Sequence, residues 1–299
     1  MKNLRSTISD NLVAYAFLAP ALLILVIGLV YPLITTVQMS FIDHNMGTPW
    51  ETREWVGLKW FKKLIADGDT WYSFWVTLRY GFWVVLIEII LGTGLALALE
   101  RPIRGASIYR TALIMPLMIS PIVVGLIWRY LFDARTGMIN YYLGQIGIEP
   151  ILWLSDPNIA LTSLIITDVW QWTPFIFIIV LAGLQGIPKD VIEASEIDGA
   201  NWWQMTFLVK LPMIKSVLIV ALLMRIVDVY KVVEVVFILT EGGPGLETEL
   251  LALHVYKVAF LSQNLGYASA ISMLLLGIVT VLSIIVLTFS NPMKTKSDF

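Results

Sequence analysis

Residues 193–212 have the sequence EASEIDGANWWQMTFLVKLP and lie between two long apolar runs of the chain. A handful of polar residues would be enough to connect two such runs, whereas this segment is long and has a pattern of its own. Between residues 187 and 209 the chain carries one base, Lys189, and four acids: Asp190, Glu193, Glu196 and Asp198. What this acidic, glycine-interrupted segment does depends on the setting that the rest of the chain gives it.

The composition is that of a membrane protein. Of the 299 residues, 58% are hydrophobic and 14% are charged, and the mean hydropathy is +0.80, whereas soluble domains have about 25% charged residues. The absence of cysteine excludes disulfides, thiolate catalysis and cysteine-ligated zinc, and the presence of only two histidines, His44 and His254, argues against a histidine metal site. The formal net charge of -2 and the lack of a basic patch argue against nucleic acid as a partner.

Six apolar segments are long enough to cross a bilayer. A spanning helix needs about 20 predominantly apolar residues, and the expected spans cover residues 12–34, 71–99, 111–132, 159–185, 216–239 and 265–290. The first run is too long for the apolar part of a cleaved signal, which has about 7 to 15 residues, so we expect it to be retained. The sequence therefore predicts an all-α membrane protein with six transmembrane helices.

The lysines and arginines outside these spans are distributed unevenly between the two sides of the membrane. Cytoplasmic loops are enriched in these residues, and the side that holds both termini carries ten of them against six on the other side. The ten are Lys2, Arg5, Arg101, Arg104, Arg110, Lys189, Lys210, Lys215, Lys294 and Lys296, and the six are Arg53, Lys59, Lys62, Lys63, Arg135 and Lys257. We therefore expect both termini, and with them the quoted segment, to be cytoplasmic.

On the opposite side, residues 42–70 form the longest polar loop in the first half of the chain. It mixes acids and bases with three tryptophans, Trp50, Trp55 and Trp60. Tryptophan is enriched where a membrane protein meets the interface. We expect this extracytoplasmic loop to be a small folded or capping element.

The cytoplasmic segment has the local features of a short helix, a break and a second short helix. Pro188 suits the first turn of a helix, and Asp190 and Glu193 place negative charge near its positive end. Gly199 in a helix interior would cost about 1 kcal/mol relative to alanine, so we expect a bend there, and Pro212 marks the entry to the fifth span. Anionic lipid headgroups would repel such an acidic element, so its expected neighbour is a basic protein surface or water.

The spacing within this segment resembles the signature loop of the permeases of ATP-binding-cassette importers. Here Glu193-Ala194-Ser195 is followed by three residues, Gly199, nine residues, Val209, one residue and Leu211-Pro212. The family pattern is Glu-Ala-Ala, three residues, Gly, nine residues, Ile, one residue and Leu-Pro, so Ser195 and Val209 are mild departures. A plain amphipathic connector with chance spacing is the alternative.

Three further runs resemble the carbohydrate-uptake branch of this family, the maltose-type inner-membrane permeases. They are residues 55–58, 197–200 and 239–244. The resemblance implies the fold of a type I importer permease, with residues 1–299 as a single transmembrane permease domain and residues 187–212 as a cytoplasmic coupling loop. In the family this loop seats in a groove of the ATPase, and the matched positions here are Glu193, Ala194, Ser195, Gly199, Leu211 and Pro212.

The same resemblance implies a set of partners. These are a second, similar permease subunit that makes a heterodimer, two ATP-binding-cassette ATPase subunits and an extracytoplasmic solute-binding protein. The chain itself would need no cofactor, because ATP and magnesium belong to the ATPase. It would reside in the plasma (inner) membrane of a bacterium or archaeon and carry a sugar or polyol.

Four charged residues lie in the fifth expected span. Arg225, Asp228, Lys231 and Glu234 alternate in sign at a spacing of three, so that each neighbouring pair can form an i,i+3 contact, while the row winds around the helix. A charge at the centre of a spanning helix costs about 2.5 to 3.5 kcal/mol. Asp228 and Lys231 therefore either border a wet cavity or belong to an internally neutralised row that packs against other helices.

Glu88, Arg129 and Asp168 are the other charged residues in expected spans that we consider. Asp168 lies close in sequence to Trp172, and carboxylates combined with flat aromatic rings bind sugars and polyols. The same tryptophan also suits ordinary packing or an interfacial position. The candidate residues for substrate or the translocation pathway are Glu88, Asp168, Trp172, Asp228 and Lys231.

The sequence lacks the patterns of an enzyme. No nucleophile paired with a base, no metal-ligand spacing and no phosphate-binding glycine loop occurs in it, so we expect a transport subunit that does not hydrolyse ATP itself. One alternative is an ion- or proton-coupled secondary transporter with Asp228, Lys231 and Glu88 as a relay. Another is an integral-membrane enzyme or assembly factor, which would need a polar catalytic constellation at a membrane edge.

Overall fold

The computed structural model describes residues 15, 17–100 and 105–290. Among these residues, four helices are long and apolar enough to cross a membrane, and two sharply bent helix pairs bring the number to six if each pair is one span. The four continuous helices are Phe17–Met39, Gly68–Leu99, Ala160–Gln185 and Leu265–Phe289. This agrees with the predicted all-α, six-span architecture. Residues 12–14, and Lys2, Arg5, Arg101, Arg104, Lys294 and Lys296 of the charge count, lie outside the described residues.

The chain forms two compact units. The first consists of Met1–Ala66 with Val255–Leu274, and the second of Asp67–His254 with Leu275–Phe299. In the first unit, the helix Phe17–Met39 includes a wider π-helical turn, η1 (Val26–Val30), and α2 (Tyr31–Met39). None of the most apolar stretch of this helix is buried, as befits a surface that faces lipid or another chain.

The predicted loop 42–70 folds into small elements. Strands β1 (Ile42–Asp43) and β2 (Glu54–Trp55) pair antiparallel, with η2 (Trp50–Thr52) between them, and α3 (Lys59–Ala66) follows. The indole of Trp60 is buried and donates to the Ile42 carbonyl oxygen at 2.9 Å. Its ring centroid lies 5.8 Å from that of Tyr267, near the start of α15 (Leu265–Ser290). The side of the membrane on which this element lies stays a prediction.

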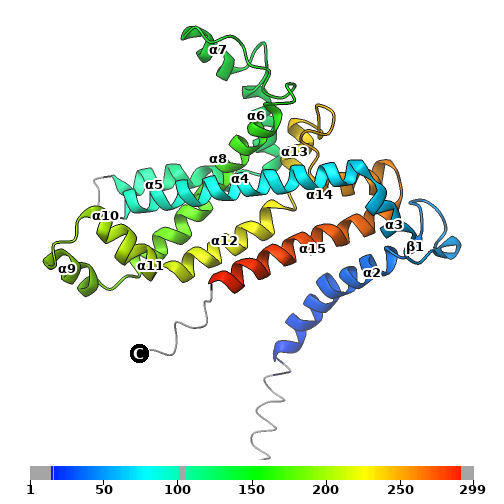
Figure 1. The fold of residues 1–299 in the computed structure, drawn as a ribbon, viewed down its shortest axis with the longest axis horizontal. Coiled ribbons are helices and arrows are strands. Elements are labelled where there is room, and N and C mark those ends of the chain that lie inside the picture. Colours follow the sequence, from blue (N-terminus) through cyan, green and yellow to red (C-terminus); the bar gives the residue numbers. More distant parts are fainter. Residues whose placement is uncertain (1–14, 16, 101–104, 291–299) are drawn as a thin grey trace, which may run out of the picture. The chain divides into compact units, whose positions relative to one another are not determined.

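In the second unit, α4 (Gly68–Leu99) and α8 (Ala160–Gln185) pack along each other (Figure 1). Asp67 caps α4 by accepting hydrogen bonds from the backbone N–H groups of the first turn. The two helices approach closely because Gly92 has no side chain: a Cβ atom there would lie 2.7 Å from Cβ of Ile176. Ile176 and Phe177 are fully buried at this contact.

The third expected span is bent rather than continuous. The sequence predicts one helix over residues 111–132, whereas α5 (Ala106–Ile114) and the 3-10 turn η3 (Met115–Met118) are followed by α6 (Pro121–Leu131) at an angle of 99°. Pro116 and Pro121 explain the break, because proline lacks a backbone N–H and clashes with the preceding turn. The Ile119 carbonyl oxygen at the bend accepts a hydrogen bond from Nε2 of Gln171 at 3.1 Å.

The fifth expected span differs at both of its ends. It begins with α10 (Trp202–Gln204), the π-helix η4 (Met205–Lys210) and α11 (Leu211–Met213), and α12 (Lys215–Val229) continues after a bend of 67°. The sequence predicts a helix to residue 239, but α12 ends at Val229 and a separate helix, α13 (Glu234–Leu239), follows. The Tyr230 ring at this break lies against Gly81, where a Cβ atom would be only 2.5 Å from it. Helices α7 (Met138–Gln145), α9 (Lys189–Ile197) and α14 (Leu251–Tyr256) and the π-helix η5 (Lys257–Leu261) complete the chain.

Candidate functional site

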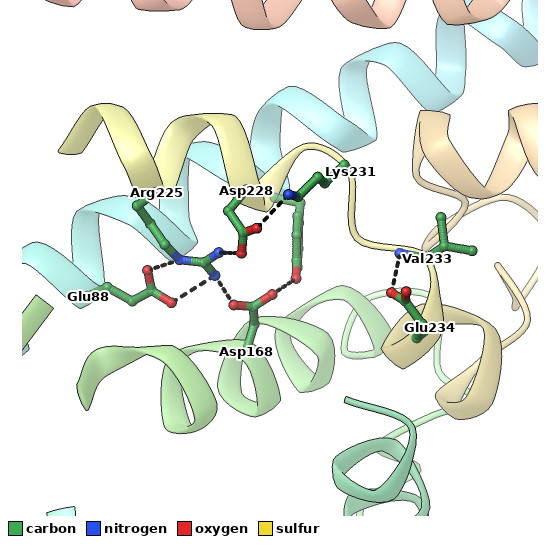
Figure 2. Close-up of polar contacts among 8 residues, drawn as sticks. Glu88, Asp168, Arg225, Asp228, Lys231, Val233 and Glu234 are labelled. Atoms are coloured by element: carbon green, nitrogen blue, oxygen red, sulfur yellow. Dashed lines mark hydrogen bonds and ion pairs between the residues drawn. The ribbon is translucent and has the colours of Figure 1, made fainter. Parts of the chain in front are cut away.

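A fully buried arginine, Arg225 of α12, is the centre of the polar cluster in the second unit (Figure 2). Its Nε lies 2.5 Å from Oε2 of Glu88 and its Nη2 lies 3.0 Å from Oε1 of the same carboxylate. The guanidinium thus grips Glu88 of α4 with two parallel hydrogen bonds, which is the strongest arrangement for this pair of groups. Both side chains are completely shielded from solvent.

Two aspartates complete the surroundings of the guanidinium. Nη2 also pairs with Asp168 of α8, and Nη1 lies 3.2 Å from Oδ2 of Asp228. The hydroxyl of Tyr80 donates to the second oxygen of Asp168. Because a buried charge is tolerated only when it is paired and hydrogen-bonded, this cluster ties α4, α8 and α12 together.

The cluster has more negative than positive charge. Glu88, Asp168 and Asp228 face two cations, Arg225 and Lys231, whose Nζ lies 3.0 Å from Oδ1 of Asp228. The Lys231 side chain is 67% exposed, whereas the others are partly or fully buried. The cluster therefore extends from a dry interior at Arg225 to an open surface at Lys231.

That surface borders a cavity of about 370 Å³. Its lining residues come from α6, α8, α12, α13 and the break between the last two: Pro121, Asp168, Trp172, Asp228, Lys231, Val232, Glu234 and Val235. Four of the five candidate pathway residues thus line one cavity. The fifth, Glu88, does not line it and is buried in contact with Arg225. The guanidinium carbon of Arg225 lies 5.1 Å from the centroid of the Trp172 ring.

The lining combines carboxylates, one ammonium group and the ring of Trp172. Carboxylates accept hydrogen bonds from hydroxyl groups, and an indole face packs against the C–H groups of a sugar ring. The arrangement suits a hydroxyl-rich, uncharged solute. None of its groups is an activated nucleophile.

The charged row of the fifth span forms only in part. The expected contacts between Arg225 and Asp228 and between Asp228 and Lys231 are present at 3.2 and 3.0 Å. Among the described residues, Lys231 and Glu234 do not form an ion pair, because the helix ends before Lys231 and the row does not continue around it. Glu234 instead accepts a weak hydrogen bond of 3.4 Å from the Val233 N–H. The two interpretations of the row therefore apply to different members, since Arg225 is neutralised and packed while Asp228 and Lys231 line the cavity.

Arg129 does not join the cluster, since its Nη1 donates to the Ile238 carbonyl oxygen at 2.9 Å, where α6 packs on α13. Sequence reasoning missed one member of the site, Tyr80, which lies eight residues before Glu88 on α4. This spacing places a polar side chain close to the helix face of a buried carboxylate, which is the pattern that could have found it. Gln171, three residues after Asp168 on α8, instead binds the bend before α6 through the Ile119 carbonyl oxygen.

A second candidate region is the quoted segment. Helix α9 begins at Lys189, so Pro188 is its N-terminal cap residue and not part of its first turn as the sequence predicted. Gly199 has φ of +79°, a left-handed conformation that glycine adopts without strain, and it separates α9 from α10. Asn201 then starts α10 with a capping box in which it and Gln204 exchange two hydrogen bonds of 2.9 Å.

The six positions matched to the signature loop divide into an exposed and an anchored group. Glu193, Ala194 and Gly199 are exposed, and Ser195 donates to the Val191 carbonyl oxygen at 2.7 Å. Leu211 packs against the apolar core, and Pro212 lies in the first turn of α11. Within the described part of the chain, the acids of this segment form no ion pair. They are Asp190, Glu193, Glu196 and Asp198, all exposed.

The sequence and the structure are similar to those of known transport proteins. The sequence matches the family described as binding-protein-dependent transport system inner membrane component over residues 88–293. The chain is 35% identical over 259 residues to the trehalose/maltose transport system permease protein MalF of Thermococcus litoralis, a match that covers 82% of this chain and 86% of the relative. It is 32% identical over 280 residues to the trehalose transport system permease protein SugA of Mycobacterium tuberculosis, with 94% of this chain and 89% of the relative covered.

A solved structure has the same fold. The crystal structure of a bacterial ABC transporter involved in the import of the acidic polysaccharide alginate includes a chain that superposes with a TM-score of 0.84. The match covers 97% of this chain and 99% of the other at 23% sequence identity. The fold is therefore that of a type I importer permease, as the signature-loop spacing indicates.

Proposed function

The chain belongs to the family of binding-protein-dependent transport system inner membrane components, and from this premise we propose that it forms half of the translocation pathway of an ATP-driven sugar or polyol importer. It is a transport component and not an enzyme, as are the permeases to which it is similar. ATP and magnesium belong to two ATPase subunits that dock on α9 and the segment that follows it. A second permease subunit makes a heterodimer with this chain in the plasma (inner) membrane of a bacterium or archaeon, and an extracytoplasmic binding protein delivers the cargo.

The strongest support comes from α9. Its acids are exposed and have no ion-pair partner among the described residues, so their charge is available to a basic surface on another protein. Such an arrangement is expected of a docking helix and not of a connector that lies on anionic lipid. The left-handed Gly199 lies between α9 and α10, and the capping box at Asn201 starts α10, so the turn between these two helices has a defined geometry.

The cavity supports the choice of cargo. Its carboxylates and the Trp172 ring suit hydroxyl groups and sugar rings, and two relatives have names that refer to trehalose or to trehalose and maltose. We call residues 187–212 the docking segment. In the proposed mechanism, ATP-driven closure of the ATPases moves this docking segment, and the spans rock so that the cavity opens to one side of the membrane and then to the other.

A capture experiment tests the docking role. The permease is purified from membranes together with its co-expressed partners, and the amount of ATPase retained is compared for the parent chain, Glu193→Lys and Glu149→Lys. Glu149 is an exposed acid between α7 and α8, so it gives the same charge change elsewhere. We expect at least a tenfold loss of ATPase with Glu193→Lys only, and equal retention in all three would contradict the docking role.

Uptake by vesicles that contain the assembled transporter and its binding protein tests the energy source. Radiolabelled trehalose and maltose are offered with ATP inside the vesicles, with and without a protonophore. We expect uptake of at least one sugar to require ATP and to be indifferent to the protonophore. Uptake that ignores ATP and collapses with the protonophore would favour the secondary transporter, with Asp228, Lys231 and Glu88 as its relay.

A further inference from the structure

The carboxyl end of α4 is held by the segment that follows α9. Lys210, the last residue of η4, forms an ion pair with Glu100, the residue that caps the end of α4. Both side chains are largely buried, with 9% and 13% of their surface exposed. Nearby, Nη2 of Arg110 donates to the Leu99 carbonyl oxygen at 2.5 Å, so two cations meet the negative end of this helix.

A second ion pair links the same parts of the chain further along. Glu88 of α4 grips Arg225 of α12, and α12 begins at Lys215, only five residues after Lys210. At a rise of about 1.5 Å per residue, the two acids lie about 18 Å apart along α4, and Lys215 and Arg225 lie about 15 Å apart along α12. Helix α4 is thus joined at two levels to the stretch that runs from η4 to α12, by Glu100 to Lys210 of η4 and by Glu88 to Arg225 of α12.

Apolar packing fills the space between these two levels. Ala96 of α4 and Ile214, which joins α11 to α12, belong to one buried cluster with Leu181 and Leu184 of α8. Sliding of α12 along α4 would have to break this packing and expose two buried ion pairs at once. Separation of a buried pair leaves uncompensated charge in an apolar environment, which strongly opposes such motion.

We infer that the Glu100–Lys210 ion pair is a positioning contact that makes η4, α11, α12 and α4 move as one rigid body. A displacement of the docking segment then reaches Arg225 and the cavity without slippage. The wide π-helical turn η4 places Lys210 so that it faces α4, in keeping with the frequent use of π-helical turns at functional positions. This role rests on the proposed docking of ATPases at α9.

The absence of cysteine in the chain allows a direct measurement of rigidity. Cysteines at two exposed positions, Ile90 on α4 and Leu208 on η4, carry the only spin labels when the partner subunits are free of cysteine. Electron paramagnetic resonance gives the distance between the labels in the assembled transporter, first without nucleotide and then with ATP, magnesium and vanadate. The variants are Glu100→Gln, the double exchange Glu100→Lys with Lys210→Glu, and the control Arg79→Gln. Arg79 lies nearer the start of α4, and its substitution removes an exposed ion pair of 3.8 Å with Glu247.

We expect a narrow distance distribution that shifts by less than about 2 Å between nucleotide states in the parent and in Arg79→Gln. Glu100→Gln should at least double the width of the distribution, and the double exchange should restore the parent width. If Glu100→Gln acted only by lowering general stability, the double exchange would not restore the width. A parent distance that changes by 5 Å or more with ATP would overturn the inference, as would a double exchange that fails to restore the width. These outcomes are separate from the proposed docking function, because docking is tested by ATPase retention in Glu193→Lys and Glu149→Lys and not by the distance between the labels.

Discussion

Arg225 and Glu88 form a fully buried ion pair with two contacts, of 2.5 and 3.0 Å, between residues that lie 137 positions apart in the chain. Asp168 and Asp228 share the same guanidinium, so three carboxylates contact one cation, and Asp228 also pairs with Lys231. The members of this cluster are therefore not equivalent. Removal of the Arg225 guanidinium leaves buried carboxylates without their cation, whereas removal of one carboxylate leaves Arg225 paired with the other two.

The first prediction follows from this asymmetry. Arg225→Met should destabilise the protein by about 3 to 5 kcal/mol, the cost of leaving buried charge without its partner, while Glu88→Gln should cost about 1 to 3 kcal/mol, the range for a lost buried hydrogen bond. The unfolding temperature of the purified transporter in detergent measures both. Equal effects, or a larger effect of Glu88→Gln, would mean that Arg225 is not the centre of the cluster.

The cluster also shows which contacts of the site can be predicted from the sequence. Contacts at a spacing of three residues, such as that between Arg225 and Asp228, follow from helix geometry alone. The contact between Arg225 and Glu88 joins different helices, and nothing in local periodicity specifies which buried acid meets which base. Sequence reasoning therefore found the charged residues and the contact between Arg225 and Asp228, but not the partners of Arg225 on α4 and α8, nor Tyr80.

The helix boundaries show a similar division. The bend before α6 has a cause visible in the sequence, Pro116 and Pro121, although the apolar run favoured a continuous span. The end of α12 at Val229 has none, because residues 230–233 contain neither proline nor glycine. There the chain leaves the helix where the Tyr230 ring packs against Gly81, a tertiary contact that local preference does not contain.

A second prediction concerns the close approach of α4 and α8. Gly92→Ala would place a methyl group 2.7 Å from Cβ of Ile176, and overpacking of this kind costs about 1 to 3 kcal/mol. Gly94, two residues further along α4, has no atom within 4 Å of the same position, so Gly94→Ala should leave stability unchanged or slightly raised. Thermal unfolding of the two variants side by side checks this, and a destabilised Gly94→Ala would point to helix geometry rather than packing as the cause.

A third prediction concerns the backbone at Gly199. Its φ of +79° is unfavourable for residues with branched side chains, and no atom lies within 4 Å of the position of a Cβ atom, so the strain would be conformational and not steric. Gly199→Val should reduce ATPase capture and sugar uptake at least fivefold, whereas Gly199→Asn should retain most of both, because asparagine tolerates this region. If Val and Asn behave alike, then the left-handed conformation is not needed for docking.

The last prediction separates a role in transport from a role in stability at Lys231. Its side chain is 67% exposed and its ion pair with Asp228 is open to solvent, and such pairs contribute about 0.2 to 1 kcal/mol. Lys231→Met should therefore leave the unfolding temperature and the ATPase content of the complex almost unchanged. Among the described residues Lys231 supplies the one ammonium group of the cavity lining, so its removal makes the cavity more negative and leaves it fewer hydrogen-bond donors.

If the cavity binds cargo, the concentration of trehalose or maltose that gives half-maximal ATP-driven uptake should rise at least threefold in this variant. Lys215→Met serves as the matched control, because Lys215 is an exposed lysine at the start of α12 that does not line the cavity. Equal kinetics in the parent and both variants would remove Lys231 from the translocation pathway, and with it the main reason to place the cargo beside Asp228.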